Sequence, residues 1–198
     1  MKGTWIFAAA VSCGLSAVIG AVASRSHVAA AASPSEDQRS ERLFMQMAPV
    51  LRSPRCMNCH TSTDFPRQGD DGHRHLMSVA RGPQDHGAPA LQCQTCHLDT
   101  NNPETGVPGA PEWHLAPLSM AWEGLSAAQI CAVMLDPKRG GLRPDEFVAH
   151  IETPLVQWDW APGTDLDGQA RTTPPIPRDE FLQLVREWVQ SGAKCPRS

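Results

Sequence analysis

The chain has 198 residues, of which 17 are basic and 21 acidic, and its formal net charge is −4 at neutral pH. This length suits a single domain. An acidic chain has no electrostatic basis for holding the phosphate backbone of DNA or RNA, so its composition argues against a nucleic-acid-binding protein.

The first 32 residues differ from the rest of the chain. Lys2 is followed by an apolar run at 5–23, and no acidic residue occurs before Glu36. This pattern is typical of a secretory signal peptide. The run of about 19 residues is also long enough to stay as an N-terminal membrane anchor. Residues 33–198 are therefore predicted to form one domain in a bacterial periplasm, soluble or tethered to the inner membrane by the N-terminal segment.

The exported part opens with a predicted helix over about 38–47. Leu43, Phe44 and Met47 fall on one side of it, and it is expected to end before Pro49. Met45 and Met47 are expected to pack in the interior rather than to bind a metal.

One short motif, C-x-x-C-H, then occurs twice, at 56–60 and at 93–97. It is the attachment signature of a c-type haem. Both thiols form thioether bonds to the porphyrin, and the adjacent histidine supplies an axial imidazole to the iron. The motifs predict two covalent haems c, and the cofactor-binding residues are Cys56, Cys59, His60, Cys93, Cys96 and His97.

Other uses of such cysteine pairs are less well matched. Four cysteines in two C-x-x-C pairs could hold a structural zinc ion, but zinc does not need a histidine after each pair. A thioredoxin-like redox site also uses C-x-x-C, but it occurs once and within a βαβ unit. Disulfides are the remaining alternative in an exported chain.

Glycine, proline and paired aspartates mark 64–77 as a loop. No alternating apolar pattern predicts a strand anywhere in 56–120. The proline-rich segment 101–124 carries Trp113 and Trp122, and we expect it to form an ordered loop whose tryptophans wall a haem.

Three helices are predicted in the C-terminal third. One starts at Ser126 with a capping box and stops near Asp136, and a second covers 144–151 with proline in its first turn. The third covers 178–191, and Gly192 follows it as a cap. Its apolar stripe consists of Phe181, Leu184, Val185 and Trp188. The predicted fold class is mainly α with extensive irregular loops and no substantial sheet, as a small dihaem cytochrome c-like domain.

Cys131 and Cys195 remain once the motif cysteines and Cys13 of the leader are set aside. Two left-over cysteines in an exported protein are expected to form a disulfide. The alternative is two buried free thiols.

The second axial ligand decides whether each iron is six-coordinate and suited to electron transfer, or open to small molecules. His75, which lies between the motifs, and His114, which follows Trp113 and lies 17 residues beyond His97, are the first choices for distal metal ligands. Only one of His73 and His75 is expected to bind, because alternate residues of an extended segment point apart. The reserves are His73, His86, His150, Met77 and Met120.

Beyond the motifs, the chain resembles exported dihaem proteins labelled isoquinoline 1-oxidoreductase subunit. The resemblance rests on 56–60, 64–75, 93–97, 113–126 and 188–196, and it covers most of the chain after residue 40. It implies a cytochrome partner that accepts electrons from a molybdenum hydroxylase. The chain lacks the cysteine patterns that bind [2Fe–2S] clusters in the catalytic chains of such enzymes, so the resemblance does not extend to the substrate.

Three functions compete on these residues. The first is electron transfer by a protein that is not itself an enzyme, with redox proteins as partners. The second is a dihaem enzyme, a peroxidase or small-molecule reductase, in which one iron is open and His86 or His150 acts beside it. The third is a haem-based sensor or assembly factor, which is disfavoured because no output domain follows.

Overall fold

The computed structural model of the chain describes Met1, Gly3 and residues 35–197. The predicted signal peptide or anchor at 1–32, including Cys13, falls almost entirely outside these residues. Within 35–197 every helix is too short or too polar to cross a bilayer.

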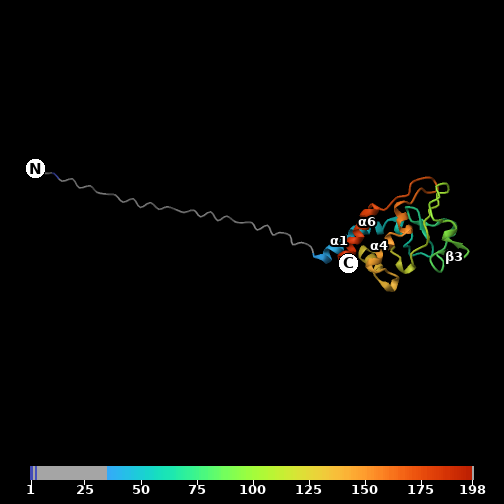
Figure 1. Ribbon diagram of the computed structural model, residues 1–198, viewed down its shortest axis with the longest axis horizontal. Helices are drawn as coiled ribbons and strands as arrows, with labels where there is room; N and C mark the ends of the chain where they lie inside the picture. The colour runs from blue at the N-terminus through green and yellow to red at the C-terminus, as the bar shows by residue number, and fades with distance from the viewer. Residues whose placement is uncertain (2, 4–34, 198) are drawn as a thin grey trace. The chain divides into compact units, whose positions relative to one another are not determined.

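Helices and long irregular segments make up residues 35–197 (Figure 1). The helices are α1 (Glu36–Leu51), α2 (Pro54–Met57), α3 (Ala127–Met134), α4 (Pro144–Ile151), α5 (Pro154–Gln157) and α6 (Arg178–Gln190). The strands are β1 (Arg67–Gln68), β2 (His73–Arg74), β3 (Gly87–Ala88) and β4 (Leu91–Gln92). The predicted class, mainly α with extensive loops and no substantial sheet, is confirmed.

Helix α1 is longer at both ends than predicted. Ser35 caps its start, since the Ser35 hydroxyl accepts from Gln38 N–H and the Gln38 side chain accepts from Ser35 N–H. The predicted end before Pro49 is wrong, because the helix continues to Leu51. Val50 and Leu51 are buried there, and their burial favours the last turn despite the proline. Met45 is half exposed, so only Met47 of the two methionines packs in the interior.

The apolar core lies where α1 and α6 pack side by side, with α3 and α4 against them (Figure 1). The fully buried Trp188 of α6 is its centre. Its ring lies 5.4 Å from the Phe44 ring of α1 and 5.7 Å from the Phe147 ring of α4, measured between centroids. Tilted and edge-to-face contacts of this kind are the preferred geometry of aromatic pairs. The core therefore joins the first and last helices, and Met120 and Trp122 from the middle of the chain also belong to it.

The C-terminal helices match their predictions closely. Ser126 caps α3 in a capping box with Gln129, and α4 has the predicted bounds. In α6, Leu184 is only half-buried, and Leu182 joins the buried stripe instead. Gly192 follows α6 with a φ of +95°, a conformation that favours glycine. The short helices α2 and α5 are too brief for periodicity to predict them.

Two small hairpins correct the prediction that 56–120 contains no strand. β1 pairs antiparallel with β2, and β3 pairs antiparallel with β4. Each strand has two residues, so an alternating apolar pattern has no room to develop. Each hairpin places a histidine, since β2 begins with His73 and His86 immediately precedes β3.

Cys131 of α3 and Cys195 after α6 form the predicted disulfide. The cross-link joins residues 64 positions apart and lies beside the α1–α6 core.

Replacing Cys131 and Cys195 together by alanine is expected to lower the free energy of unfolding by about 4 kcal/mol, because the cross-link closes a long loop in the unfolded chain. Urea denaturation followed by far-UV circular dichroism measures the change. The wild-type protein in excess reductant is the control and should lose the same amount. Equal stability of the variant and the oxidised wild type would show that the cross-link does not contribute.

Candidate functional site

The first motif lies at the end of α2, where a tight turn brings its cysteines and histidine together. Cys59 N–H and His60 N–H both donate to the carbonyl of Cys56, the latter over 3.0 Å. The His60 side chain is held by a distant segment, 120–122. Its Nδ1 lies 2.8 Å from the carbonyl oxygen of Met120, and its ring stacks on Trp122 with centroids 3.5 Å apart. Because Nδ1–H donates to that carbonyl, Nε2 is left free to bind a metal.

The second motif repeats this plan. His97 N–H donates to the carbonyl of Cys93 over 3.0 Å, and His97 Nδ1 lies 2.8 Å from the carbonyl oxygen of Pro108. The His97 ring stacks on Trp113 with centroids 4.4 Å apart and planes at 2°. Gly109 lets the backbone after Pro108 pack against the backbone at Thr100, because a Cβ at Gly109 would lie 2.2 Å from the carbonyl oxygen of Thr100. Both motif histidines therefore present Nε2 and are fixed in the same way.

Both motif imidazoles are neutral at neutral pH. Desolvation by burial lowers the pKa of His60 to about 4, although the hydrogen bond to Met120 opposes this shift. The pKa of His97 is lowered to about 4 for the same reason, against the bond to Pro108. A neutral imidazole is the form that binds a metal ion.

The four motif cysteines are free thiols, in contrast to the disulfide-bonded pair. Burial raises the pKa of the Cys59 thiol to about 12, and it raises that of Cys56 as well. The charge of Cys93 adds to the shift at Cys59. Cys96 is exposed, whereas Cys56, Cys59 and Cys93 are partly buried.

A cavity of about 250 Å³ opens beside the first motif. Apolar side chains form most of its wall, and Cys56, Cys59 and His60 line it. Arg55 and Trp122 also line it, and each has a buried donor with no partner among the described residues: Nε of Arg55 and Nε1 of Trp122. An apolar cavity with free thiols, a neutral imidazole and unpaired donors fits a covalently bound haem, which is largely apolar and carries polar groups.

The residues 35–197 contain no group of three or more His, Cys, Asp or Glu close enough to hold a metal ion. The four motif cysteines therefore do not converge as the ligands of one structural zinc ion would.

His75, one of the two predicted distal ligands, lies beside His97. Their ring centroids are 5.9 Å apart and their planes cross at 72°. Since an imidazole nitrogen binds a metal ion at roughly 2 Å and the ring centre lies about 1 Å behind it, two rings on opposite sides of one ion have centres about 6 Å apart. His75 Nδ1 lies 2.6 Å from the carbonyl oxygen of Leu76, which leaves Nε2 free here too. The observed centroid separation of 5.9 Å is close to this value.

His114, the other predicted distal ligand, lines the same cavity as His60. Its Nδ1 lies 2.5 Å from the carbonyl oxygen of Glu112, and its ring stacks on His86 with centroids 4.8 Å apart. His150 lines this cavity as well, and desolvation, followed by the charge of His114, lowers its pKa. Sequence reasoning ranked His150 below His114, and the structure places both in the wall of the cavity beside the first motif.

The remaining reserves are placed less favourably. His73 is exposed and its Nδ1 lies 2.5 Å from Asp71. Met77 is 83 % exposed. Met120 is buried and lines the same cavity, but its own carbonyl lies 2.8 Å from His60 Nδ1, so its backbone is on the Nδ1 side of that ring.

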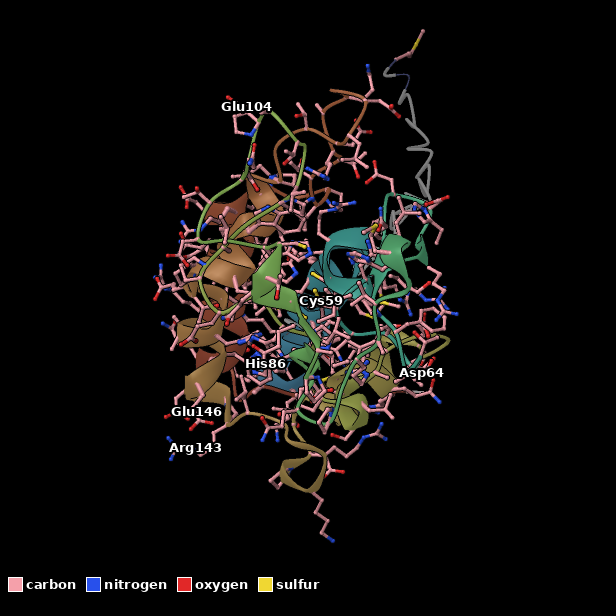
Figure 2. All side chains as sticks on the ribbon, turned by 90° about the vertical axis from the view of Figure 1, so that its right-hand side faces the viewer. Cys59, Asp64, His86, Glu104, Arg143 and Glu146 are labelled. Carbon is pink, nitrogen blue, oxygen red and sulfur yellow. A yellow bond between two sulfur atoms is a disulfide. The ribbon has the colours of Figure 1, made fainter. Side chains whose placement is uncertain are left out.

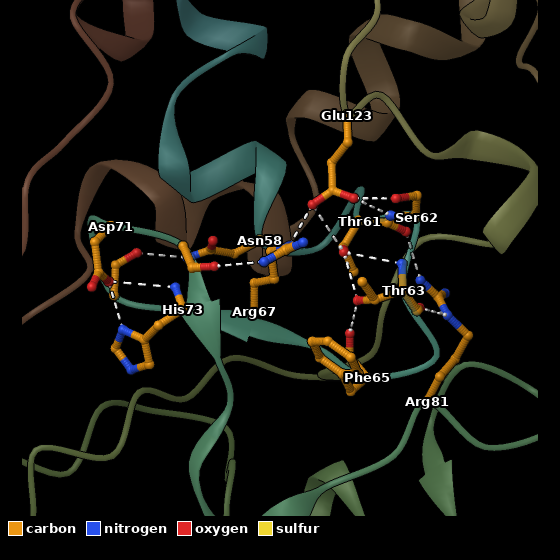
Figure 3. A network of polar contacts seen from close by, with 12 residues as sticks. Asn58, Thr61, Ser62, Thr63, Phe65, Arg67, Asp71, His73, Arg81 and Glu123 are labelled. Atoms are coloured by element: carbon orange, nitrogen blue, oxygen red, sulfur yellow. Dashed lines mark hydrogen bonds and ion pairs between the residues drawn. The ribbon is translucent and has the colours of Figure 1, made fainter.

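Polar contacts fasten the loops around the first motif (Figure 3). The Glu123 carboxylate accepts from Ser62 N–H over 2.9 Å, from the Ser62 hydroxyl and from Arg67 Nε. Burial raises the pKa of Glu123, but these partners outweigh it and the pKa lies below its ordinary value. Because Glu123 follows Trp122, this network holds the indole against His60.

Arg81 is a second fastening point and is buried. It pairs with Asp85 and donates to three backbone carbonyls, those of Thr61, Thr63 and Ala116. The guanidinium therefore joins the segment after the first motif to the segment that carries His114.

Sequence reasoning missed Asp159, which is 7 % exposed and lines the cavity. Its Oδ2 lies 3.5 Å from Cys56 Sγ. Burial raises the pKa of the Asp159 carboxyl to about 7, although Cys56 and Arg55 pull it down. Its position between Trp158 and Trp160, both in the cavity wall, was the available signal.

Figure 2 shows Cys59 inside the domain in this view, while Glu104, Arg143 and Glu146 lie at its edge.

Replacing Asp159 by asparagine is expected to stabilise the protein above pH 7 and to matter little near pH 4. The folded chain keeps the Asp159 proton up to a pKa of about 7, whereas the unfolded chain loses it near 3.8. The free energy of unfolding of the wild type, relative to that of the variant, should therefore fall as the pH rises from about 4 to about 7. The expected fall is a few kcal/mol, because the pKa differs by about three units between the unfolded and folded chains. Urea denaturation at pH 4.5 and pH 8 measures it, with the exposed Asp167→Asn as the control. A pH-independent difference would contradict the assignment.

The chain matches no family model, no curated protein and no solved structure in comparisons with known proteins. The functional argument therefore rests on the geometry of its own residues.

Proposed function

We propose that this protein carries two covalent c-type haems and transfers single electrons. The observation that supports this best is the common geometry of the two motifs. In each, free cysteines precede a neutral histidine whose Nδ1 donates to a backbone carbonyl at 2.8 Å and whose ring stacks on a tryptophan. Orientation of a ligand imidazole by such a hydrogen bond is the usual outer-shell arrangement at metal sites.

In this proposal the residues of the two motifs have the following roles. Cys56 and Cys59 hold one haem and Cys93 and Cys96 the other, and the haem iron supplies reversible one-electron chemistry. His60 and His97 bind iron through Nε2. The apolar cavity beside His60 excludes water, which limits reorganisation around the site and favours electron transfer over reaction with solvent.

We assign His75 to the iron held by His97 and His114 to the iron held by His60, with His150 as the alternative at the second of these. The four assigned histidines share one feature: Nδ1 of each lies within hydrogen-bonding distance of a backbone carbonyl. The described hydrogen bonds include none of this kind for His86 or His150. A second imidazole makes each iron six-coordinate, which suits electron transfer and not catalysis at an open site.

The disulfide supports export, because such bonds persist in oxidising compartments such as the bacterial periplasm. A redox protein is the partner that this function requires. The sequence resemblance described above adds a molybdenum hydroxylase as the class of electron donor to test first.

The protein made in a host that matures c-type cytochromes is expected to be coloured and to exceed the mass of its polypeptide by roughly 1.2 kDa, the mass of two haems. Cys59→Ala and Cys96→Ala should each weaken one attachment, and the pair together should abolish normal haem content. Mass spectrometry and the absorption spectrum of the reduced protein measure both. The control is Cys131→Ala with Cys195→Ala, which should keep two haems. A colourless wild-type protein contradicts the proposal, and rapid carbon monoxide binding by the reduced protein would favour the dihaem enzyme.

His75→Ala is expected to convert one of two low-spin haems to high-spin, because it removes the imidazole that faces His97. His73→Ala is the matched control, since His73 lies two residues away, is exposed and contacts Asp71 instead. Electron paramagnetic resonance of the oxidised protein resolves the two spin states. An unchanged spectrum in the His75 variant, or the same change in both variants, would remove His75 from the ligand set.

A further inference from the structure

Trp113 and Trp122 have matching roles at the two motifs. Trp122 stacks on His60 at 3.5 Å and 10°, and Trp113 stacks on His97 at 4.4 Å and 2°. Each indole covers one face of a motif imidazole and so limits its rotation. If these roles were purely local, each tryptophan would affect one site alone.

Trp113 differs from Trp122 because it also belongs to the other site. It lines the cavity that Cys56, Cys59 and His60 share, although it stacks on the histidine of the second motif. Trp122 lines the same cavity, but it does so at its own motif. Among the aromatic contacts of residues 35–197, Trp122 meets only His60.

A second contact extends the connection. The Trp113 ring meets the Trp158 ring edge to face, with centroids 4.8 Å apart and planes at 77°. Trp158 lines the cavity too, and the Arg55 guanidinium lies 5.7 Å over its ring. An unbroken series of aromatic contacts therefore runs from the His97 imidazole to the wall of the first motif's cavity.

We propose that Trp113 is the positioning residue that couples the two haem sites, because one indole both orients the His97 imidazole and forms part of the wall around the haem at His60. The inference rests on the proposed function. A substitution at Trp113 therefore alters both the site at His60 and the site at His97, whereas a substitution at Trp122 alters only the site at His60.

The test compares Trp113→Leu with Trp122→Leu in the mature holoprotein. Removing the indole of Trp113 frees the His97 ring, so the resonance signal of the second haem should shift and broaden. It also opens the cavity wall to water, which favours the charged, oxidised iron, so the reduction potential of the first haem should fall. Electron paramagnetic resonance and a spectroscopic redox titration measure the two effects, and the His75→Ala variant identifies the signal of the second haem.

Trp122→Leu is the matched control, since it is the same substitution at the same kind of stack. It should alter the signal and potential of the first haem and leave those of the second unchanged. The proposal is overturned if Trp113→Leu alters the second haem alone, or neither haem. The proposed function is tested separately by the haem content of the wild-type protein. A wild-type protein without haem would contradict that function, whatever the Trp113 variants do.

If Trp113→Leu fails to fold or loses a haem, Trp113→Phe decides the question. The smaller ring keeps a face for His97 and withdraws from the cavity wall. The potential of the first haem should then fall while the second haem keeps its signal. No change at the first haem in this variant would contradict a role for Trp113 in both sites.

Discussion

Two hydrogen bonds, from the Nδ1 atoms of His60 and His97 to the carbonyls of Met120 and Pro108, organise the middle of this chain. Each joins a motif to a segment that follows it, so the proline-rich stretch from 98 to 125 must fold back over both motifs. The stretch has little regular structure of its own, and its carbonyls would otherwise be left to water. Buried backbone acceptors need partners, and here the imidazoles provide them. The arrangement satisfies the loop and sets the orientation of the histidines at once.

Charged side chains provide the second support for these loops. Glu123 and Arg81 are both surrounded by partners, and each joins segments that no helix connects. Such charges are costly to bury alone, but hydrogen bonds to several partners offset that cost. The helical core formed by α1, α3, α4 and α6 supplies the apolar burial. Leu51, Phe147 and Phe181 of this core also line the cavity, so the part that stabilises the fold also shapes the site.

The sequence predicted the helices best where capping signals and apolar stripes coincide, as at Ser126 and along α6. It failed at the end of α1, where burial of Val50 and Leu51 outweighs Pro49, and at two-residue strands too short to carry a pattern. The motif residues could be predicted because the C-x-x-C-H spacing is itself the signature and needs no tertiary contact to be recognised. The carbonyls of Met120 and Pro108 could not be predicted, because any residue has one and only the fold selects which is near. Asp159 was missed for a related reason: its two tryptophan neighbours indicate an apolar wall, but only the fold brings its carboxyl group beside Cys56.

The disulfide between Cys131 and Cys195 bears on how the chain matures. After residue 32 the sequence contains six cysteines, and six thiols in an oxidising compartment admit about fifteen complete pairings, none of which leaves the four motif thiols free. A C-x-x-C pair is especially prone to close on itself. If the four motif sulfurs are captured as thioethers first, Cys131 and Cys195 have only each other left, and the native cross-link forms without any need for reshuffling. The order of the covalent steps, rather than the stability of any intermediate, would then guard the chain against mispaired products.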